Sequence, residues 1–147
     1  MTAQIGDKIS YIGQEYVLAS EPLSPYLYSN KIEKLFIGFN SACYRGYYAT
    51  WKIENKSLYL MDIESPASLK NEDADKMEEQ RSAMNTLFPG QTKIFADWVN
   101  GKLKIQSGKI LKYVPMGYES VYESDLFLTF ENGILVNEKV VINTPTE

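Results

Sequence analysis

Residues 47–63 read YYATWKIENKSLYLMDI, and this stretch predicts a β-hairpin. Side chains at alternate positions are apolar, as on the inner face of a half-buried strand. The expected inner-face residues are Tyr47, Ala49, Trp51 and Ile53 in the first strand, and Leu58 and Leu60 in the second. Asparagine tolerates a positive φ, so Asn55 and Lys56 are expected to form the tight turn between the two strands.

Further short strands are expected on both sides of this hairpin, because apolar runs alternate with turn residues. The expected strands cover residues 8–12, 15–18, 35–39, 94–96, 97–99, 102–105, 110–114, 121–122, 126–130 and 134–136. The expected turns lie at Gly13-Gln14, Asn100-Gly101, Ser107-Gly108 and Asn132-Gly133. Asn100-Gly101 is a strong signal for a type I′ hairpin turn. Residues 21–31 are expected to form a loop, because prolines and short polar residues interrupt them.

A change of period predicts one long helix at about residues 71–87. Ala74, Met77, Arg81, Met84 and Phe88 are spaced by three and four, as on one side of a helix. Acidic residues in the first turn suit the helix dipole, and a Pro-Gly pair follows the last turn. The apolar stripe is expected to face the core, in preference to a partner, since a single helix on a sheet must bury one face.

These elements predict an α+β fold in which β structure predominates. Short turns between successive strands indicate sequential antiparallel pairing, in a twisted sheet or a partly closed barrel with one main helix at about residues 71–87. At 147 residues the chain is expected to form a single domain over residues 1–147. Residues 144–147 are expected to be a flexible C-terminal tail.

Composition and charge narrow the classes of partner. The net charge is −4, and no basic run is long enough to follow a phosphate backbone, so nucleic-acid binding is not expected. No apolar run reaches the ~20 residues that span a bilayer, and no secretory signal is recognised at the N-terminus. One cysteine cannot form an internal disulfide. Together these features predict a cytoplasmic protein with no membrane partner.

The chain has no histidine, and this absence restricts its chemistry. It removes the commonest general base at neutral pH, the Ser-His and Cys-His nucleophile pairs, and the standard zinc ligand sets. No glycine-rich phosphate loop or dinucleotide fingerprint is present. We therefore expect no cofactor, no metal site and no assigned catalytic residue.

The segment that leads into the first hairpin strand contains the first candidate binding residues, Tyr44, Arg45 and Tyr48. Arg45 is one of only two arginines, and its planar fork suits stacking on tyrosine or pairing with a carboxylate of a ligand. An internal pairing with an acidic residue of the chain is the favoured alternative. Cys43 is expected to be a small buried residue in preference to a reactive thiol.

A second group of candidate binding residues comprises Asp97, Tyr118, Glu119, Tyr122 and Glu123. Two acids in one cleft suit paired-carboxylate chemistry, and tyrosines suit the stacking of a sugar or a peptide. A solvated acidic loop and a tyrosine-filled core are the favoured alternatives, because the spacing fixes no acid–base pair.

Several short motifs resemble those of a group of small bacterial proteins with no established activity. The motifs are RGY at 45–47, ATW at 49–51, LYL at 58–60, LFPG at 87–90, FADW at 95–98 and the tyrosine-rich residues 113–123. The resemblance implies a single-domain protein of the bacterial cytosol and implies nothing about catalysis.

The small size, the mild acidity, the abundant tyrosine and the lack of catalytic groups favour a non-enzymatic binding or interaction protein. One form of it is an immunity- or inhibitor-like protein that binds a protein partner. The alternative is a small-ligand-binding or carboxylate-dependent hydrolytic barrel that places Arg45, Asp97, Glu119 and Glu123 around a tyrosine-lined cavity. The sequence leaves the oligomeric state open.

Overall fold

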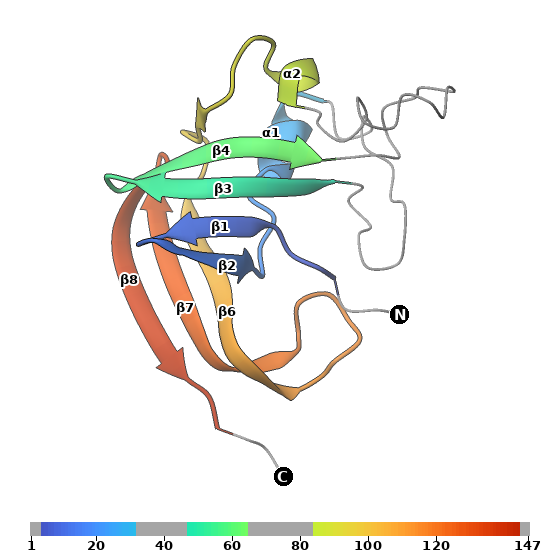
Figure 1. The fold of residues 1–147 in the computed structure, drawn as a ribbon, viewed down its shortest axis with the longest axis vertical. Helices are drawn as coiled ribbons and strands as arrows, with labels where there is room; N and C mark the ends of the chain where they lie inside the picture. The colour runs from blue at the N-terminus through green and yellow to red at the C-terminus, as the bar shows by residue number, and fades with distance from the viewer. Residues whose placement is uncertain (1–3, 32–46, 65–83, 145–147) are drawn as a thin grey trace.

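The computed structural model describes residues 4–31, 47–64 and 84–144 (Figure 1). The chain forms eight strands and two short helices in these ranges. The elements are β1 (Lys8–Tyr11), β2 (Gln14–Leu18), α1 (Ser24–Ser29), β3 (Tyr48–Glu54), β4 (Ser57–Glu64), α2 (Met84–Leu87), β5 (Ile94–Phe95), β6 (Gly101–Lys112), β7 (Val121–Glu131) and β8 (Ile134–Ile142). The prediction that β structure predominates is confirmed.

The β3–β4 hairpin forms as the sequence predicts. Its turn residues Asn55 and Lys56 have φ values of 50° and 65°, as a type I′ turn requires. The expected inner-face side chains are buried, apart from Ile53, which is half-buried against the core. A register shift between Thr50 and Trp51 marks a bulge in β3. The two-residue alternation of this segment therefore decided both its pairing and its buried face.

Seven strands close into a barrel in the order β3-β1-β2-β6-β7-β8-β4, and β4 pairs back onto β3. β5 adds to β4 outside this ring. β1 and β3 pair in parallel, with Ile9 opposite Trp51. The predicted sheet was wholly antiparallel and its barrel only partly closed, and both details are wrong. Pairing of sequence neighbours cannot reveal the β1–β3 contact, because it joins strands that are not consecutive.

A buried dipeptide joins these two parallel strands. Asp7 is completely buried, and its carboxylate accepts hydrogen bonds from the backbone N–H of Ala49 at 2.9 Å and from Nε1 of Trp51 at 3.1 Å. The adjacent Gly6 lies so close to β2 that a Cβ atom there would stand 1.7 Å from the carbonyl oxygen of Leu18. The position of the start of β1 therefore depends on the buried carboxylate of Asp7 and on the absence of a side chain at Gly6.

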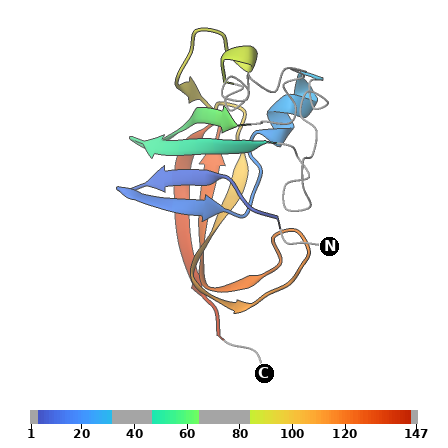
Figure 2. The ribbon, with the colours of Figure 1, turned by 45° about the vertical axis from the view of Figure 1, so that its right-hand side comes forward.

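The long strands β6, β7 and β8 form an antiparallel sheet that extends beyond the hairpins of β1–β2 and β3–β4 (Figures 1 and 2). Asn132 and Gly133 form the β7–β8 turn, with φ values of 49° and 82°, as predicted. The turn predicted at Ser107-Gly108 is instead a bulge within β6, where Gly108 has a φ of 84°. The side chain of Glu123 closes this bulge by accepting the Lys109 N–H at 2.5 Å.

The hairpin predicted at Asn100-Gly101 does not form, because residues 97–99 are not a strand and Gly101 already pairs with Phe130 of β7. Oδ1 of Asn100 instead accepts the N–H of Asn132 at 2.9 Å. The turn between β1 and β2 lies at Ile12-Gly13, one residue earlier than predicted.

The second edge of β4 is shared between two strands. β8 pairs with β4 only through Ser57 and Ile134. Beyond that point β5 takes the edge, with Phe95 opposite Tyr59. The ladders meet at Gly133, where a Cβ atom would stand 2.5 Å from the carbonyl oxygen of Ala96. β8 must therefore leave β4 after one residue pair.

The helices differ from the prediction in place and length. Residues 71–83 of the predicted long helix lie outside the described residues, as does the predicted strand 35–39, and α2 forms its last turn. The predicted loop 21–31 is wrong in part, because it contains α1. α1 contributes Tyr26 to an aromatic cluster, with ring centroids 4.6 Å from Trp98 and 5.3 Å from Phe88. This cluster fixes the helix against the barrel, since aromatic packing outweighs the turn propensity of a proline-containing segment.

We expect Gly6→Ala to destabilise the fold by more than about 3 kcal/mol, because the new methyl group meets backbone atoms that cannot move aside. Urea denaturation followed by circular dichroism measures the loss. Gly90→Ala is the matched control: its φ is 76°, but its site has open space, so the expected cost is only about 1–2 kcal/mol. Equal stability of the two variants would contradict this account of β1.

Candidate functional site

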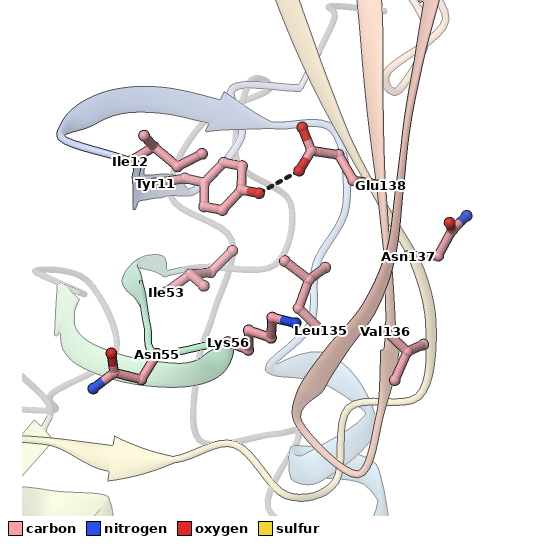
Figure 3. A pocket seen from close by; sticks show the side chains of 9 residues that line it. All are labelled: Tyr11, Ile12, Ile53, Asn55, Lys56, Leu135, Val136, Asn137 and Glu138. Carbon is pink, nitrogen blue, oxygen red and sulfur yellow. Dashed lines mark hydrogen bonds between the residues drawn. The ribbon is translucent and has the colours of Figure 1, made fainter.

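The departure of β8 from β4 leaves a groove at the side of the barrel, which we call the seam groove. It has a volume of about 540 Å³. Its walls come from the tips of the β1–β2 and β3–β4 hairpins on one side and from β8 on the other (Figure 3). The lining residues are Tyr11, Ile12, Ile53, Asn55, Lys56, Leu135, Val136, Asn137 and Glu138. Apolar side chains and a few polar groups thus converge in one hollow, as in ligand sites.

One polar contact crosses the seam groove. The hydroxyl of Tyr11 on β1 donates a hydrogen bond to Oε2 of Glu138 on β8 (Figure 3). Burial, this hydrogen bond and the negative charge of Glu138 raise the pKa of Tyr11 to about 12. Tyr11 therefore remains a neutral hydrogen-bond donor at physiological pH, and it holds Glu138 in place. Since β1 and β8 are not neighbours in the barrel, this contact links the two walls directly.

The seam groove continues into an open strand edge. β8 pairs with β7 along one side from Ile134 to Ile142. On its other side, within the described residues, only Ile134 pairs with another strand. Val136, Val140 and Ile142 expose 50%, 56% and 73% of their surface along this stretch. The seam groove and the open edge of β8 together form one continuous surface, which we call the seam.

The structure places the first group of predicted residues only in part. Tyr44 and Arg45 lie outside the described residues, as does Cys43. Tyr48 is half-buried at the start of β3, opposite Glu64 of β4. It lines a second, smaller cavity of about 280 Å³, away from the seam groove. The role of this group stays a prediction.

The structure does not bring the second predicted group together. Asp97 follows β5 and lies near the Gly101 end of the β6–β7 hairpin, whereas Glu119 lies in the connection at its far end. The twelve residues of β6 between these ends correspond to about 40 Å of extended strand. Both carboxylates are exposed. The cavity that the hydrolytic alternative requires is therefore not formed by these two residues.

The remaining predicted residues of this group have structural contacts. The hydroxyl of Tyr118 donates to Oε2 of Glu21 at 2.8 Å and so joins the β6–β7 connection to the segment before α1. The carbonyl oxygen of Tyr122 accepts from Nδ2 of Asn143 at 2.8 Å. Glu123 closes the bulge in β6 and also lines a cavity of about 410 Å³ beside Ile142.

Sequence reasoning missed the residues that line the seam groove. Tyr11 was expected only as a strand residue, and residues after 136 were not assigned to a strand at all. The one available signal was the run Val136-Asn137-Glu138-Lys139-Val140-Val141-Ile142, which is rich in β-branched residues and has no proline. Local sequence cannot show which strand a distant carboxylate faces, because the Tyr11–Glu138 contact spans 127 positions.

Comparison with known proteins gives no identification. Among family models, curated proteins and solved structures, none matches the chain significantly. The resemblance that the short motifs suggest thus stays a prediction. Within the described residues, no group of three acidic or cysteine side chains is placed to hold a metal ion. No helix in the same part of the chain is long and apolar enough to cross a membrane.

We expect Tyr11→Phe to lose about 1 kcal/mol of stability at pH 8, the usual contribution of one hydrogen bond. The folded-state pKa of Tyr11 lies above the ordinary value of 10.0, so this stabilisation is complete below pH 10 and is lost as the pH rises through about 12. Urea denaturation of the wild type and Tyr11→Phe at several pH values measures their free energies of unfolding. The difference between the two should become smaller as the pH rises.

The control for this prediction is Glu138→Gln, which removes the charge and keeps the shape of the side chain. The tyrosinate absorbance of the wild type, after subtraction of Tyr11→Phe, should titrate near pH 12. The absorbance difference between Glu138→Gln and the double variant Tyr11→Phe/Glu138→Gln also reports Tyr11. It should titrate at a lower pH than the wild-type difference. A midpoint near 10 in the wild type would show that the hydroxyl does not face Glu138.

Proposed function

We propose that this protein is a non-enzymatic binding protein that accepts an extended segment of a protein partner at the seam. The observation that carries this proposal is the open edge of β8. A strand edge presents unpaired N–H and C=O groups, and a second chain in the β conformation can pair with them. Soluble proteins usually protect such edges with prolines, several charges or covering loops. β8 contains no proline, and its protection along this stretch is limited to the charges of Glu138 and Lys139 and to a bulge at Val136, where the register with β7 shifts.

The seam groove supports the same function. A chain that pairs with the open edge runs beside residues 136–142 and reaches the groove at Glu138 and Val136. Ile53 and Leu135 in the groove offer apolar contacts for alternate side chains of that chain. Glu138 and Lys56 at the rim offer one charge of each sign for its polar side chains. Backbone pairing would give affinity, and the groove would give specificity.

The finer features of the proposal rest on composition. An inhibitor- or immunity-like protein, which neutralises its partner by covering it, is one form of such a binding protein. The proposal places the protein in a reducing cytosol, since the only cysteine has no second cysteine of the chain to pair with.

We test the function with a display library of random peptides selected on the immobilised protein. Peptides with alternating apolar residues should be enriched and should bind Val140→Pro at least about tenfold more weakly, because proline removes an edge N–H and its ring obstructs the incoming strand. The Val140 N–H does not face β7, so this proline should leave the fold intact.

Val140→Thr is the matched control for the display experiment. It keeps the backbone N–H and nearly the same shape, and it should bind the enriched peptides like the wild type. Thermal denaturation of all three proteins checks that the fold is retained. An absence of enriched peptides, or equal binding by the proline variant, would refute a binding site at the seam.

A further inference from the structure

We propose that the partner at the seam is a second copy of this chain, and that two copies associate by antiparallel pairing of β8 with β8. This proposal names the occupant of the same surface and therefore rests on the proposed function. It is carried by the self-complementarity of the open edge, which favours one register over all others.

The direction of the backbone groups along β8 follows from one hydrogen bond. The N–H of Asn143 donates to the carbonyl oxygen of Glu123 on β7 at 2.9 Å. In an antiparallel ladder these groups alternate between the two sides of a strand. The N–H and C=O groups of Ile142, Val140 and Glu138 therefore point away from β7, toward the open edge.

A symmetric pair of strands needs a residue that faces its own copy, because directly opposed side chains lie on the same face of a sheet. With Val140 on the two-fold axis, Val140 faces Val140 of the second copy. On each side of the axis, Glu138 of one copy faces Ile142 of the other. These three hydrogen-bonded pairs carry two bonds each, or six in all. Lys139 faces Val141 of the second copy on the opposite face.

The neighbouring registers are weaker. With Lys139 on the axis, two lysines face each other. Only Glu138 and Val140 then form hydrogen-bonded pairs, which give four bonds, because Ile142 faces Val136, the residue that the β7–β8 register skips as a bulge. With Glu138 on the axis, two carboxylates oppose each other. With Val141 on the axis, Val140 pairs with Ile142, and only four bonds form within β8, because Glu138 would face Thr144 beyond the end of the strand. The Val140 register thus combines the most hydrogen bonds with no contact between like charges.

The shape of the molecule accommodates this pairing. Figures 1 and 2 both show the lower part of β8 extending below β1 and β2, so that two barrels would lie at opposite ends of the joined strands. The same register places Asn143 of the second copy opposite Asn137, beside the bulge at Val136.

The size of the contact determines its strength. Pairing covers the exposed side chains of Val140 and Ile142, which are 56% and 73% exposed. Five paired residues on each side are far fewer than the ~20–30 of a standard interface, so the contact belongs with weak, transient associations. We therefore expect reversible association with a dissociation constant of about 1–100 μM, typical of weak interfaces.

Sedimentation velocity over a range of concentrations tests the association. The wild type should shift toward twice the monomer mass as its concentration rises, and Val140→Thr should behave in the same way. Val140→Pro should remain a monomer with an unchanged thermal midpoint. A wild type that stays monomeric to about 1 mM, well above the expected dissociation constant, would refute the second copy as partner.

A cysteine scan tests the register in a Cys43→Ser background. Lys139→Cys, Val140→Cys and Val141→Cys are oxidised at equal concentration, and disulfide-linked dimers are quantified on non-reducing gels. Opposed Cα atoms in a hydrogen-bonded pair lie ~5.5 Å apart, within disulfide range, whereas the diagonal neighbours at 139 and 141 do not. Val140→Cys should therefore form dimers about tenfold faster than the other two.

Equal rates at the three positions, or a fastest rate at 139 or 141, would refute this register. The failure of this proposal is distinguishable from that of the proposed function. If the wild type is monomeric but displayed peptides bind it and not Val140→Pro, the seam binds a different chain. If neither association nor peptide binding depends on Val140, both proposals are wrong.

Discussion

The second edge of β4 is the constraint on which the candidate site depends. That edge has room for one ladder at a time, and the two-residue strand β5 occupies it directly after Ser57. Gly133 allows the two ladders to meet, since its missing side chain admits the Ala96 carbonyl. The barrel closes through a single residue pair, and among the described residues most of β8 therefore has only β7 as a neighbour. The seam is the direct result.

Two sets of side-chain contacts support the barrel near this weak closure. The completely buried carboxylate of Asp7 joins β1 to the bulge of β3 through two hydrogen bonds, and buried acceptors of this kind are costly to leave unpaired. The Tyr11–Glu138 contact then connects β1 to β8 across the seam groove. Together these contacts hold the groove walls apart at a fixed distance without a continuous ladder between them.

Much of the local structure could be predicted from sequence, and the reasons are specific. The alternation in β3 and β4 and the Asn-Lys turn fixed that hairpin, and Asn132-Gly133 fixed another, because a type I′ turn has few compatible residues. Asn100-Gly101 carries the same signal and forms no hairpin, since Asn100 uses its side chain to support the turn at Asn132. Ser107-Gly108 forms a bulge in place of a turn, and the carboxylate of Glu123 on the neighbouring strand accepts the N–H of Lys109 there. Both errors come from partners that lie far along the chain.

The sequence by itself determined that this protein is rich in β structure, which face of the first hairpin is buried, and that chemistry based on histidine is excluded. Those properties depend on residue type and on spacing over a few positions. Only the tertiary structure decided that β1 and β3 run in parallel, that the barrel closes through one residue pair, and that Tyr11 faces Glu138. These contacts join residues between 42 and 127 positions apart, and no local pattern encodes which strand edge remains free once the others have paired.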